Sequence, residues 1–391
     1  MAEPSPGVGH TDSMNSHDDP DKLVDGKKKK SRRPATTIEG LAVQELQIDY
    51  STCNTDAPNA TEFGSTTNFL MDDSLITSAF KSDTKVNAQW RHEVVNHTYR
   101  GNYVVQNVSK CVLNFVLPDD MEPPVLFYYR LTNFYQNHRR YVASFYDKQL
   151  LGDDVNTESS VSDSSCTPLT TDDATNLPYY PCGLIANSMF NDTFFSPVYQ
   201  TENETYVMQN SSDIAWSSDN ALYGNLPSTQ DLSTILPPPN WQRQYPDGKY
   251  TTDAPPPDLK DNQAFQVWMR TAGLPTFSKL YMRNDSATMK SGTYEIQILS
   301  EFPTTEYQGS KSIVFTTKSV IGGKNPFLGI AYVVVGGICI VLGGIFTVTH
   351  LIRPRKLGDH TYLSWNKVSN NGAKPGAGGP SVGMATGRDL S

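Results

Sequence analysis

Long apolar runs are scarce in this sequence of 391 residues, and its N-terminal part holds none. A secretory signal peptide needs an apolar stretch of about 7 to 15 residues, so none is predicted within residues 1–37. These residues are polar and lead into the basic cluster KKKKSRR, Lys27 to Arg33. We therefore expect residues 1–37 to be a disordered, basic cytosolic tail.

Positive charge is also in deficit, because the formal net charge is -9 and the pI is about 5.3. In isolation, the cluster at Lys27 is also consistent with a nuclear-localisation or nucleic-acid patch, but the cytosolic flank of a membrane helix has the same composition. The acidic remainder of the chain argues against nucleic acid as a partner.

One apolar segment stands out, Pro326 to Ile352, which contains no Asp, Glu, Lys or Arg. As a helix it spans about 40 Å, more than the roughly 30 Å hydrocarbon core of a bilayer. Arg353, Arg355 and Lys356 follow it, so the positive-inside bias predicts a cytosolic tail over 353–391 and a lumenal region over 38–325.

Glycines recur every seven residues in this segment, which gives one face of the predicted helix small side chains. Such a stripe favours close packing of another membrane helix, although glycine is common in membrane helices in general. The predicted packing positions are Gly329, Gly336 and Gly343.

N-glycosylation sequons occur only in the region assigned to the lumen. Because this region is rich in Asn, Ser and Thr, the placement of the sequons carries more weight than their number. The predicted glycosylation sites are Asn59, Asn96, Asn107, Asn191, Asn203, Asn210 and Asn284.

Four of the five cysteines lie in the same region, and Cys339 lies in the apolar segment. A compartment that glycosylates also oxidises thiols, so two disulfides are expected. Four cysteines allow three pairings, and the sequence does not choose between them. We favour Cys53 with Cys111 and Cys166 with Cys182, mainly because the second pair closes a short loop.

Short runs rich in Val, Ile, Tyr, Phe and Thr dominate the lumenal region and predict a mainly β fold. Two helices are also expected, over Asn133 to Lys148 and over Phe265 to Ala272, whereas Leu151 to Asn176 is predicted to be a surface loop. The predicted strands are Tyr99–Val105, Cys111–Leu117, Val125–Leu131, Thr293–Leu299 and Ser312–Thr317.

The catalytic motifs that the sequence suggests fail on spacing. HEVVNH at His92 to His97 places its histidines five apart, whereas a zinc-protease helix needs them four apart. GGKN at Gly322 lacks the remainder of a phosphate loop, and the acidic pairs at Asp153 and Asp172 lack a calcium-loop pattern. We therefore predict no catalytic, cofactor-binding or metal-binding residues.

Several long strings resemble one family, the flippase β-subunits, also called the ligand-effect modulator or cell-division-control fifty family. The match runs in order from about Val43 to Asn366. The strings are YYRLTNFYQNHRRYVASFYDK from Tyr128, PCGLIANSMFNDTF from Pro181, FQVWMRTAGLPTFSKLY from Phe265, GGKNPFLGIAYVVVGG from Gly322 and RKLGDHTYLSWN from Arg355.

The resemblance implies an antiparallel β-sandwich ectodomain, glycosylated and disulfide-bonded, with a few short helices. It also implies a noncatalytic subunit that needs no cofactor and partners a type IV P-type ATPase, which moves phospholipids from the exoplasmic to the cytosolic leaflet. The subunit supports exit of the pair from the endoplasmic reticulum. Integral membrane residence in the endoplasmic reticulum, Golgi, endosome or plasma membrane is expected.

The chain departs from the family pattern in one respect. RRPA at Arg32 resembles the segment that leads into a first membrane helix, yet the ectodomain opens at Val43, and PATTIEGLA between them is too short and too polar to span a bilayer. We expect that a first helix is missing, through splicing, a gene-model error or design, and that insertion and partner binding are weaker as a result.

Two other classes fit the topology alone. A single-pass receptor or adhesion glycoprotein predicts a signal peptide and repeated modules, and neither is found in the sequence. A membrane-anchored lumenal hydrolase predicts an acid, base or nucleophile constellation, and none is found. Neither class accounts for the family strings.

Overall fold

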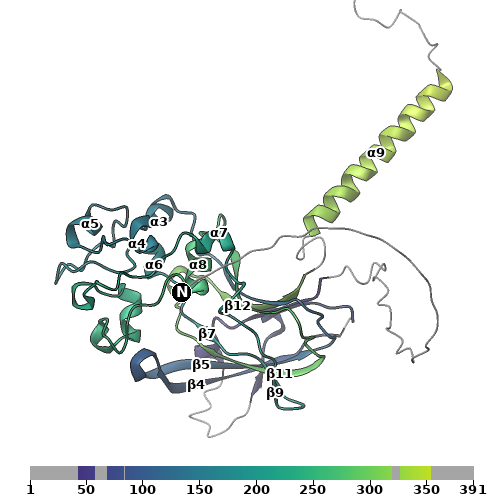
Figure 1. The fold of residues 1–391 in the computed structure, drawn as a ribbon. Coiled ribbons are helices and arrows are strands. Elements are labelled where there is room, and N and C mark those ends of the chain that lie inside the picture. Colours follow the sequence, from purple (N-terminus) through teal and green to yellow (C-terminus); the bar gives the residue numbers. More distant parts are fainter. Residues whose placement is uncertain (1–42, 58–67, 83, 319–325, 354–391) are drawn as a thin grey trace, which may run out of the picture. The chain divides into compact units, whose positions relative to one another are not determined.

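The computed structural model describes residues 43–57, 68–82, 84–318 and 326–353. The chain divides into two compact units, Met1–Gly323 and Lys324–Ser391. Within the described residues, the first unit contains two antiparallel β-sheets and a set of short helices, and the second contains one long helix (Figure 1). The predicted mainly β class is therefore confirmed.

The first sheet has five strands in the order β10-β6-β12-β1-β3, and every pair in it is antiparallel. Its register places Ile48 opposite Ile313 and Phe127 opposite Phe315. Its strands are β1 (Glu45–Asp49), β3 (Ile76–Ala79), β6 (Val125–Leu131), β10 (Phe277–Asn284) and β12 (Lys311–Thr317).

The second sheet has seven strands in the order β2-β4-β5-β11-β8-β9, with β7 also paired to β11. The long hairpin of β4 and β5 pairs Trp90 with Leu113. Its strands are β2 (Phe69–Leu70), β4 (Ala88–Thr98), β5 (Val104–Leu117), β7 (Thr193–Phe194), β8 (Val198–Tyr199), β9 (Glu204–Thr205) and β11 (Gly292–Leu299).

The two sheets enclose one apolar core, as the period of two along each strand requires. Phe115 of the second sheet lies 5.5 Å, centroid to centroid, from Phe315 of the first, and both are fully buried. Phe127 meets Phe315 edge-on at 4.8 Å. These interlocking rings bury large apolar areas, which stabilises the sandwich.

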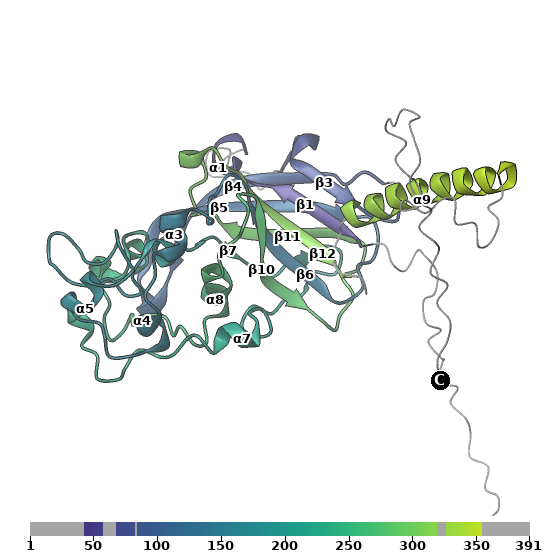
Figure 2. The same ribbon diagram turned by 90° about the horizontal axis from the view of Figure 1, so that it is seen from above.

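Short helices form a lobe beside the sandwich, built mainly from residues 132–190 and 211–276 (Figure 2). Trp268 is fully buried where this lobe meets the sheets, and its indole N–H donates to the carbonyl of Ile185 at 2.8 Å. The lobe helices are α3 (Arg139–Ala143), α4 (Asp147–Leu151), α5 (Glu158–Ser162), α6 (Leu184–Asn187), α7 (Ser217–Asn220) and α8 (Gln263–Met269).

The remaining described helical turns are short. α1 (Cys53–Asp56) follows β1, and it is the only α-helical turn described outside the lobe and the second unit. The 3-10 turns are η2 (Asp73–Leu75), η3 (Arg100–Asn102), η4 (Leu232–Thr234), η5 (Pro239–Gln244), η6 (Pro246–Gly248) and η7 (Thr305–Tyr307).

Four of the five predicted strands are confirmed, as parts of β5, β6, β11 and β12. The prediction for Tyr99–Val105 is wrong, because this stretch mostly forms the turn of the β4–β5 hairpin. Tyr99 N donates to Tyr103 O at 2.8 Å, and Gly101 has a φ of +63°. Glycine adopts that left-handed conformation at little cost, which permits the turn.

The helix predicted over Asn133–Lys148 is wrong. Asn133 has a φ of +56°, and only α3 and the start of α4 are helical in this stretch. The helical conformation of α3 ends at Ser144. The buried hydroxyl of this residue donates to Cys166 O at 2.8 Å and accepts from Leu184 N at 2.9 Å. The helical spacing of its aromatic residues instead reflects irregular chain packed against the core, where Phe134 contacts Trp268.

The helix predicted near Phe265–Ala272 is present as α8, which ends at Met269. The surface loop predicted over Leu151–Asn176 begins at the last residue of α4 and contains α5, whose Val161 is fully buried. That loop therefore has its own small core, in which Val161 packs with Cys166, Cys182 and Leu236.

The second unit contains α9 (Pro326–Ile352), which has the bounds of the predicted membrane segment. Within it, Gly329–Ile352 contains an 18-residue stretch with a mean hydropathy of 2.4 and is long and apolar enough to cross a bilayer. Thr347 and Thr349 donate their hydroxyls to the carbonyls of Gly343 and Ile345, so these groups are satisfied within the helix.

Candidate functional site

The HEVVNH motif lies on strand β4, not on a helix. His92 is buried and its Nε2 lies 3.0 Å from the hydroxyl of Ser109 on β5, whereas His97 packs edge-on against Tyr99. Among the described residues no three His, Cys, Asp or Glu side chains are grouped so as to hold a metal ion. The strand geometry thus separates the two histidines and leaves each in a structural contact.

The burial of His92 predicts a pH dependence. Burial lowers the pKa of His92, and the opposing charge of Glu93 only partly offsets this. The unfolded chain therefore binds the proton more readily, and stability is lost as pH falls below about 6.5. As pH is lowered from 7.5 to 5.5, we expect the wild type to lose more of its melting temperature than His92→Gln does. A constant difference across this range would contradict the prediction.

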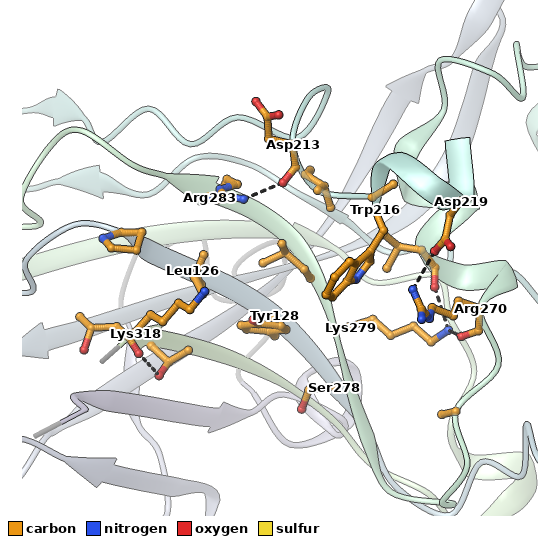
Figure 3. Close-up of a pocket in the computed structure, with 18 of the residues that line it drawn as sticks. Leu126, Tyr128, Asp213, Trp216, Asp219, Arg270, Ser278, Lys279, Arg283 and Lys318 are labelled. Carbon is orange, nitrogen blue, oxygen red and sulfur yellow. Dashed lines mark hydrogen bonds and ion pairs between the residues drawn. The ribbon is translucent and has the colours of Figure 1, made fainter. Parts of the chain in front are cut away.

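A cavity of about 700 Å³ lies on the outer face of the first sheet (Figure 3). Leu126 and Tyr128 line it and alternate along β6 with the core residues Phe127 and Tyr129. Strands β10 and β12 and the region of α7 and α8 provide the remaining walls. In Figure 3, Arg283 and Lys318 lie toward one end and Arg270 and Asp219 toward the other.

Lys279 is the most confined charged group of this cavity, only 6% exposed. Its Nζ donates to the carbonyls of Val267, Trp268 and Arg270 at 3.0, 2.7 and 2.7 Å, so it ties down the end of α8. Burial lowers the pKa of Lys279 to about 7. With its donors directed at three main-chain carbonyls, this lysine is a structural tie for α8.

The arginines of the cavity are also paired. Arg270 Nη1 lies 3.1 Å from Asp219 Oδ2, and its guanidinium stacks 5.4 Å from the ring centre of Trp216. Arg283 contacts Asp285 at 2.7 Å and donates to the main-chain carbonyl of Asp213. Both guanidinium groups are therefore compensated by a carboxylate.

Asp192 is a buried junction that joins the two sheets. Its Oδ2 lies 2.7 Å from Lys311 Nζ on β12 and accepts the Tyr50 hydroxyl at 2.8 Å, beyond the end of β1. Its Oδ1 accepts the main-chain N–H groups of Glu301 and Phe302, both at 2.6 Å. Burial and the Asp192 charge raise the pKa of Tyr50 well above its ordinary value, which keeps Tyr50 a donor.

The structure bonds Cys53 to Cys111 and Cys166 to Cys182, which is the pairing favoured from the sequence. The first disulfide links α1 to β5, and both of its cysteines are fully buried. The second closes a loop of the lobe that follows α5. Cys339 is exposed on α9 and is not disulfide-bonded.

The sequons differ in their surroundings. The side chains of four of them are exposed, namely Asn96, Asn107, Asn203 and Asn210. Asn191 and Asn284 are half-buried; Asn284 Nδ2 donates to Val207 O at 2.8 Å. Asn59 lies outside the described residues. Glycosylation at all seven positions stays a prediction.

The packing role predicted for Gly329, Gly336 and Gly343 also stays a prediction. A Cβ placed on any of the three would meet no atom within 4 Å among the described residues. GGKN at Gly322, the basic cluster at Lys27, the tail over 1–37 and most of the tail over 353–391 fall outside the described residues.

The sequence did not predict the buried ion pair of Asp192 and Lys311 or the buried hydrogen bonds of Lys279. Asp192 is the middle residue of the sequon Asn191-Asp192-Thr193, a position that usually indicates an exposed loop. Lys279 and Lys311 each stand in or beside an apolar strand, and this is the one local signal for a buried lysine. Their partners come from distant parts of the chain, so no local pattern identifies them.

Comparison with known proteins shows a consistent set of relatives. The model of the LEM3 (ligand-effect modulator 3) family / CDC50 family matches residues 37–356. The chain is 43% identical to the phospholipid-transporting ATPase accessory subunit CDC50 of Chaetomium thermophilum over 352 residues, which cover 84% of this chain and 81% of the relative.

Two further relatives come from yeast and human. The phospholipid-transporting ATPase accessory subunit CRF1 of Saccharomyces cerevisiae is 36% identical and aligns with 84% of this chain and 78% of its own length. The human cell cycle control protein 50B is 41% identical over 62% of this chain and 70% of its own length. The similarity thus extends over most of the chain in fungi and over about two thirds of it in a mammal.

Proposed function

The chain belongs to the LEM3/CDC50 family, and we infer from this membership that it is an accessory subunit of a phospholipid-transporting ATPase. The observation that carries the inference is the family match over residues 37–356, which takes in both sheets, the lobe and α9. Several relatives with accessory-subunit names align over most of the chain. A receptor or adhesion glycoprotein is not favoured.

We further propose that the subunit is noncatalytic and that the partner supplies the chemistry. The partner is a type IV P-type ATPase, which moves phospholipid from the exoplasmic to the cytosolic leaflet. The predicted contacts are the lumenal region 38–325 over the lumenal loops of the pump, α9 beside a helix of the pump, and the segment Arg355 to Asn366 at the cytosolic face. The pair leaves the endoplasmic reticulum together for the Golgi, endosome or plasma membrane.

The helix α9 is suited to such a partnership. A Cβ built on Gly329, Gly336 or Gly343 would meet no atom within 4 Å among the described residues. In a bilayer the apolar side chains are solvated by lipid, whereas a small-residue stripe gains most from another helix. This supports intramembrane pairing with the ATPase.

Co-purification tests the proposal. The chain is co-expressed with a type IV ATPase in a eukaryotic cell, in parallel with a version that carries an added membrane span after Arg33. We expect tagged subunit to retain the ATPase, with the two-span version retaining more, and lipid-dependent ATP hydrolysis to accompany the complex. Absence of the ATPase from both purifications, at equal subunit yield, would refute the proposed function.

An endoglycosidase gel shift on membrane fractions provides the topology readout. We expect the chain to lose mass on treatment, because the sequons lie in the predicted lumenal region. An unshifted band in the version with the added span would contradict the orientation assigned to residues 38–325.

A further inference from the structure

Two adjacent arginines of α3 lie at the surface without a carboxylate partner. The side chains of Arg139 and Arg140 are exposed, and neither forms an ion pair or a side-chain hydrogen bond with any residue that the structure describes. Carboxylates do pair with other arginines of the first unit, namely Arg91, Arg243, Arg270 and Arg283. In a chain with a net charge of -9, the two charges of α3 are thus available to an acidic group outside the chain.

Large apolar side chains are exposed beside these arginines. Tyr135 is 57% exposed, Val142 40% and Leu274 69%. The segments of Tyr135 and Leu274 lie side by side, because Asn137 Nδ2 donates to Gly273 O at 3.1 Å. We use the name arginine patch for the surface formed by Tyr135, His138, Arg139, Arg140, Val142 and Leu274.

Buried hydrogen bonds fix the backbone beneath the arginine patch. Gln136 is fully buried, and its Oε1 accepts from Ala272 N at 2.9 Å while its Nε2 donates to the Tyr141 hydroxyl at 3.3 Å. Phe134 N also donates to Pro275 O at 3.0 Å. Because this backbone is already ordered, a partner that binds the patch pays little for ordering it.

The residue types of the patch indicate the chemistry of its partner. Tyrosine and arginine are enriched among the residues that dominate binding energy at protein interfaces. A guanidinium group binds a carboxylate through two parallel N–H···O hydrogen bonds, and exposed apolar side chains that are grouped together mark an interaction surface. The arginine patch therefore fits a protein segment that combines carboxylates with an apolar side chain.

An anionic membrane is a poorer partner for this patch. Anionic lipids give the cytosolic leaflet its negative surface potential. The proposed orientation places residues 38–325 on the lumenal side, so the patch does not meet that leaflet.

We propose that the arginine patch docks an exoplasmic loop of the ATPase that carries Asp or Glu next to an apolar side chain. This rests on the proposed accessory function and its orientation. Arg139 and Arg140 donate to the carboxylates of the loop, and Tyr135 and Leu274 cover its apolar side chain.

Charge reversal on the exposed arginines tests the patch without disturbing the core. We expect Arg139→Glu/Arg140→Glu to lower the co-purified ATPase about tenfold or more, because like charges then face each other across the interface. Arg139→Lys/Arg140→Lys keeps the charge but loses the paired N–H donors, so its ATPase yield should fall between those of the wild type and the Glu variant.

Lys81→Glu/Lys249→Glu is the matched control. Both lysines are exposed and form no ion pair with the described residues, and the double substitution changes the net charge by the same amount. Its ATPase yield should equal that of the wild type. The assay uses whichever of the one-span and two-span versions retains the ATPase, and glycosidase-sensitive mass confirms that each variant reaches the lumen.

A photo-crosslinking residue at position 274 identifies the occupant. We expect it to label a peptide from an exoplasmic loop of the ATPase that contains Asp or Glu. Replacing those carboxylates by lysine should restore ATPase retention to Arg139→Glu/Arg140→Glu and lower it for the wild-type subunit. A folding defect in the Glu variant would not be corrected by a change in the partner, so this exchange separates docking from misfolding.

Three results would overturn the proposal while leaving the accessory function intact. These are full retention of ATPase by Arg139→Glu/Arg140→Glu, an equal loss in Lys81→Glu/Lys249→Glu, and a crosslink only to lipid, to a second copy of the chain or to a peptide without carboxylates. Failure of the wild-type versions to retain any ATPase would overturn the accessory function and this proposal together.

Discussion

Replacing Asp192 by alanine is expected to lower the free energy of unfolding by about 3 to 5 kcal/mol, the usual cost of removing one member of a buried ion pair. The change removes the carboxylate partner of Lys311, which is 2% exposed and still donates to the Phe302 carbonyl. It also leaves the Tyr50 hydroxyl and two main-chain N–H groups without their acceptor. For a domain of this size the melting temperature should fall by about 10 °C.

The two members of the pair are not expected to be equivalent. In Lys311→Met the carboxylate keeps three donors, from Tyr50, Glu301 and Phe302, so the loss should be smaller than in Asp192→Ala. Thermal unfolding of the detergent-solubilised protein, followed by size-exclusion chromatography, measures both. If Asp192→Ala yields no folded protein, Asp192→Asn replaces it in the comparison with Lys311→Met, because asparagine keeps the shape of the aspartate side chain.

An exposed ion pair serves as the control for this experiment. Lys290 and Glu202 lie 3.2 Å apart, with side chains 58% and 52% exposed. Solvent screening makes such pairs nearly neutral for stability, so Lys290→Met should melt close to the wild type. Equal changes of melting temperature in Lys290→Met and Asp192→Ala would show that burial is not the reason why the Asp192 junction stabilises the fold.

Removal of the Cys53–Cys111 disulfide should have the second large effect. Its residues are 58 apart in the sequence, against 16 for Cys166–Cys182. The chain-entropy relation then assigns about 4 kcal/mol to the first bond and about 3 kcal/mol to the second. Serine at Cys53 and Cys111 additionally buries hydroxyls at two fully buried positions, which increases the cost.

Paired substitutions test the ranking. Cys53→Ser/Cys111→Ser should melt below Cys166→Ser/Cys182→Ser, and both below the wild type, under non-reducing conditions. Alanine versions of each pair separate the loop effect from the buried hydroxyls. A lower melting temperature for the Cys166 and Cys182 pair in both series would contradict the loop-length argument.

Local composition predicted a large part of the fold. The β-rich runs at Cys111, Val125, Thr293 and Ser312 are strands, because alternating apolar side chains fit a sheet with one face in the core. The uncharged segment Pro326–Ile352 is one helix, since no other backbone conformation satisfies its own hydrogen bonds in an apolar medium.

Other elements followed tertiary contacts instead of periodicity. Phe134, Tyr141 and Phe145 have helical spacing, yet Phe134 packs on Trp268 and Ser144 bonds both Cys166 and Leu184. These long-range contacts outweigh the weak intrinsic preference of a single helix. The strand predicted at Tyr99 is wrong for a similar reason, because the hairpin needs a turn there and Gly101 adopts the positive φ that the turn requires.

The sequence by itself determined the family, the mainly β class and the membrane segment, since each depends on residue types that are neighbours in the chain. Tertiary structure alone decided the Asp192 junction and the Lys279 tie. Lys311 lies 119 residues from Asp192 in the sequence, and Lys279 caps the helix that precedes its own strand. Whether a charge is buried or exposed depends on which distant segments fold over it, and no local pattern contains that information.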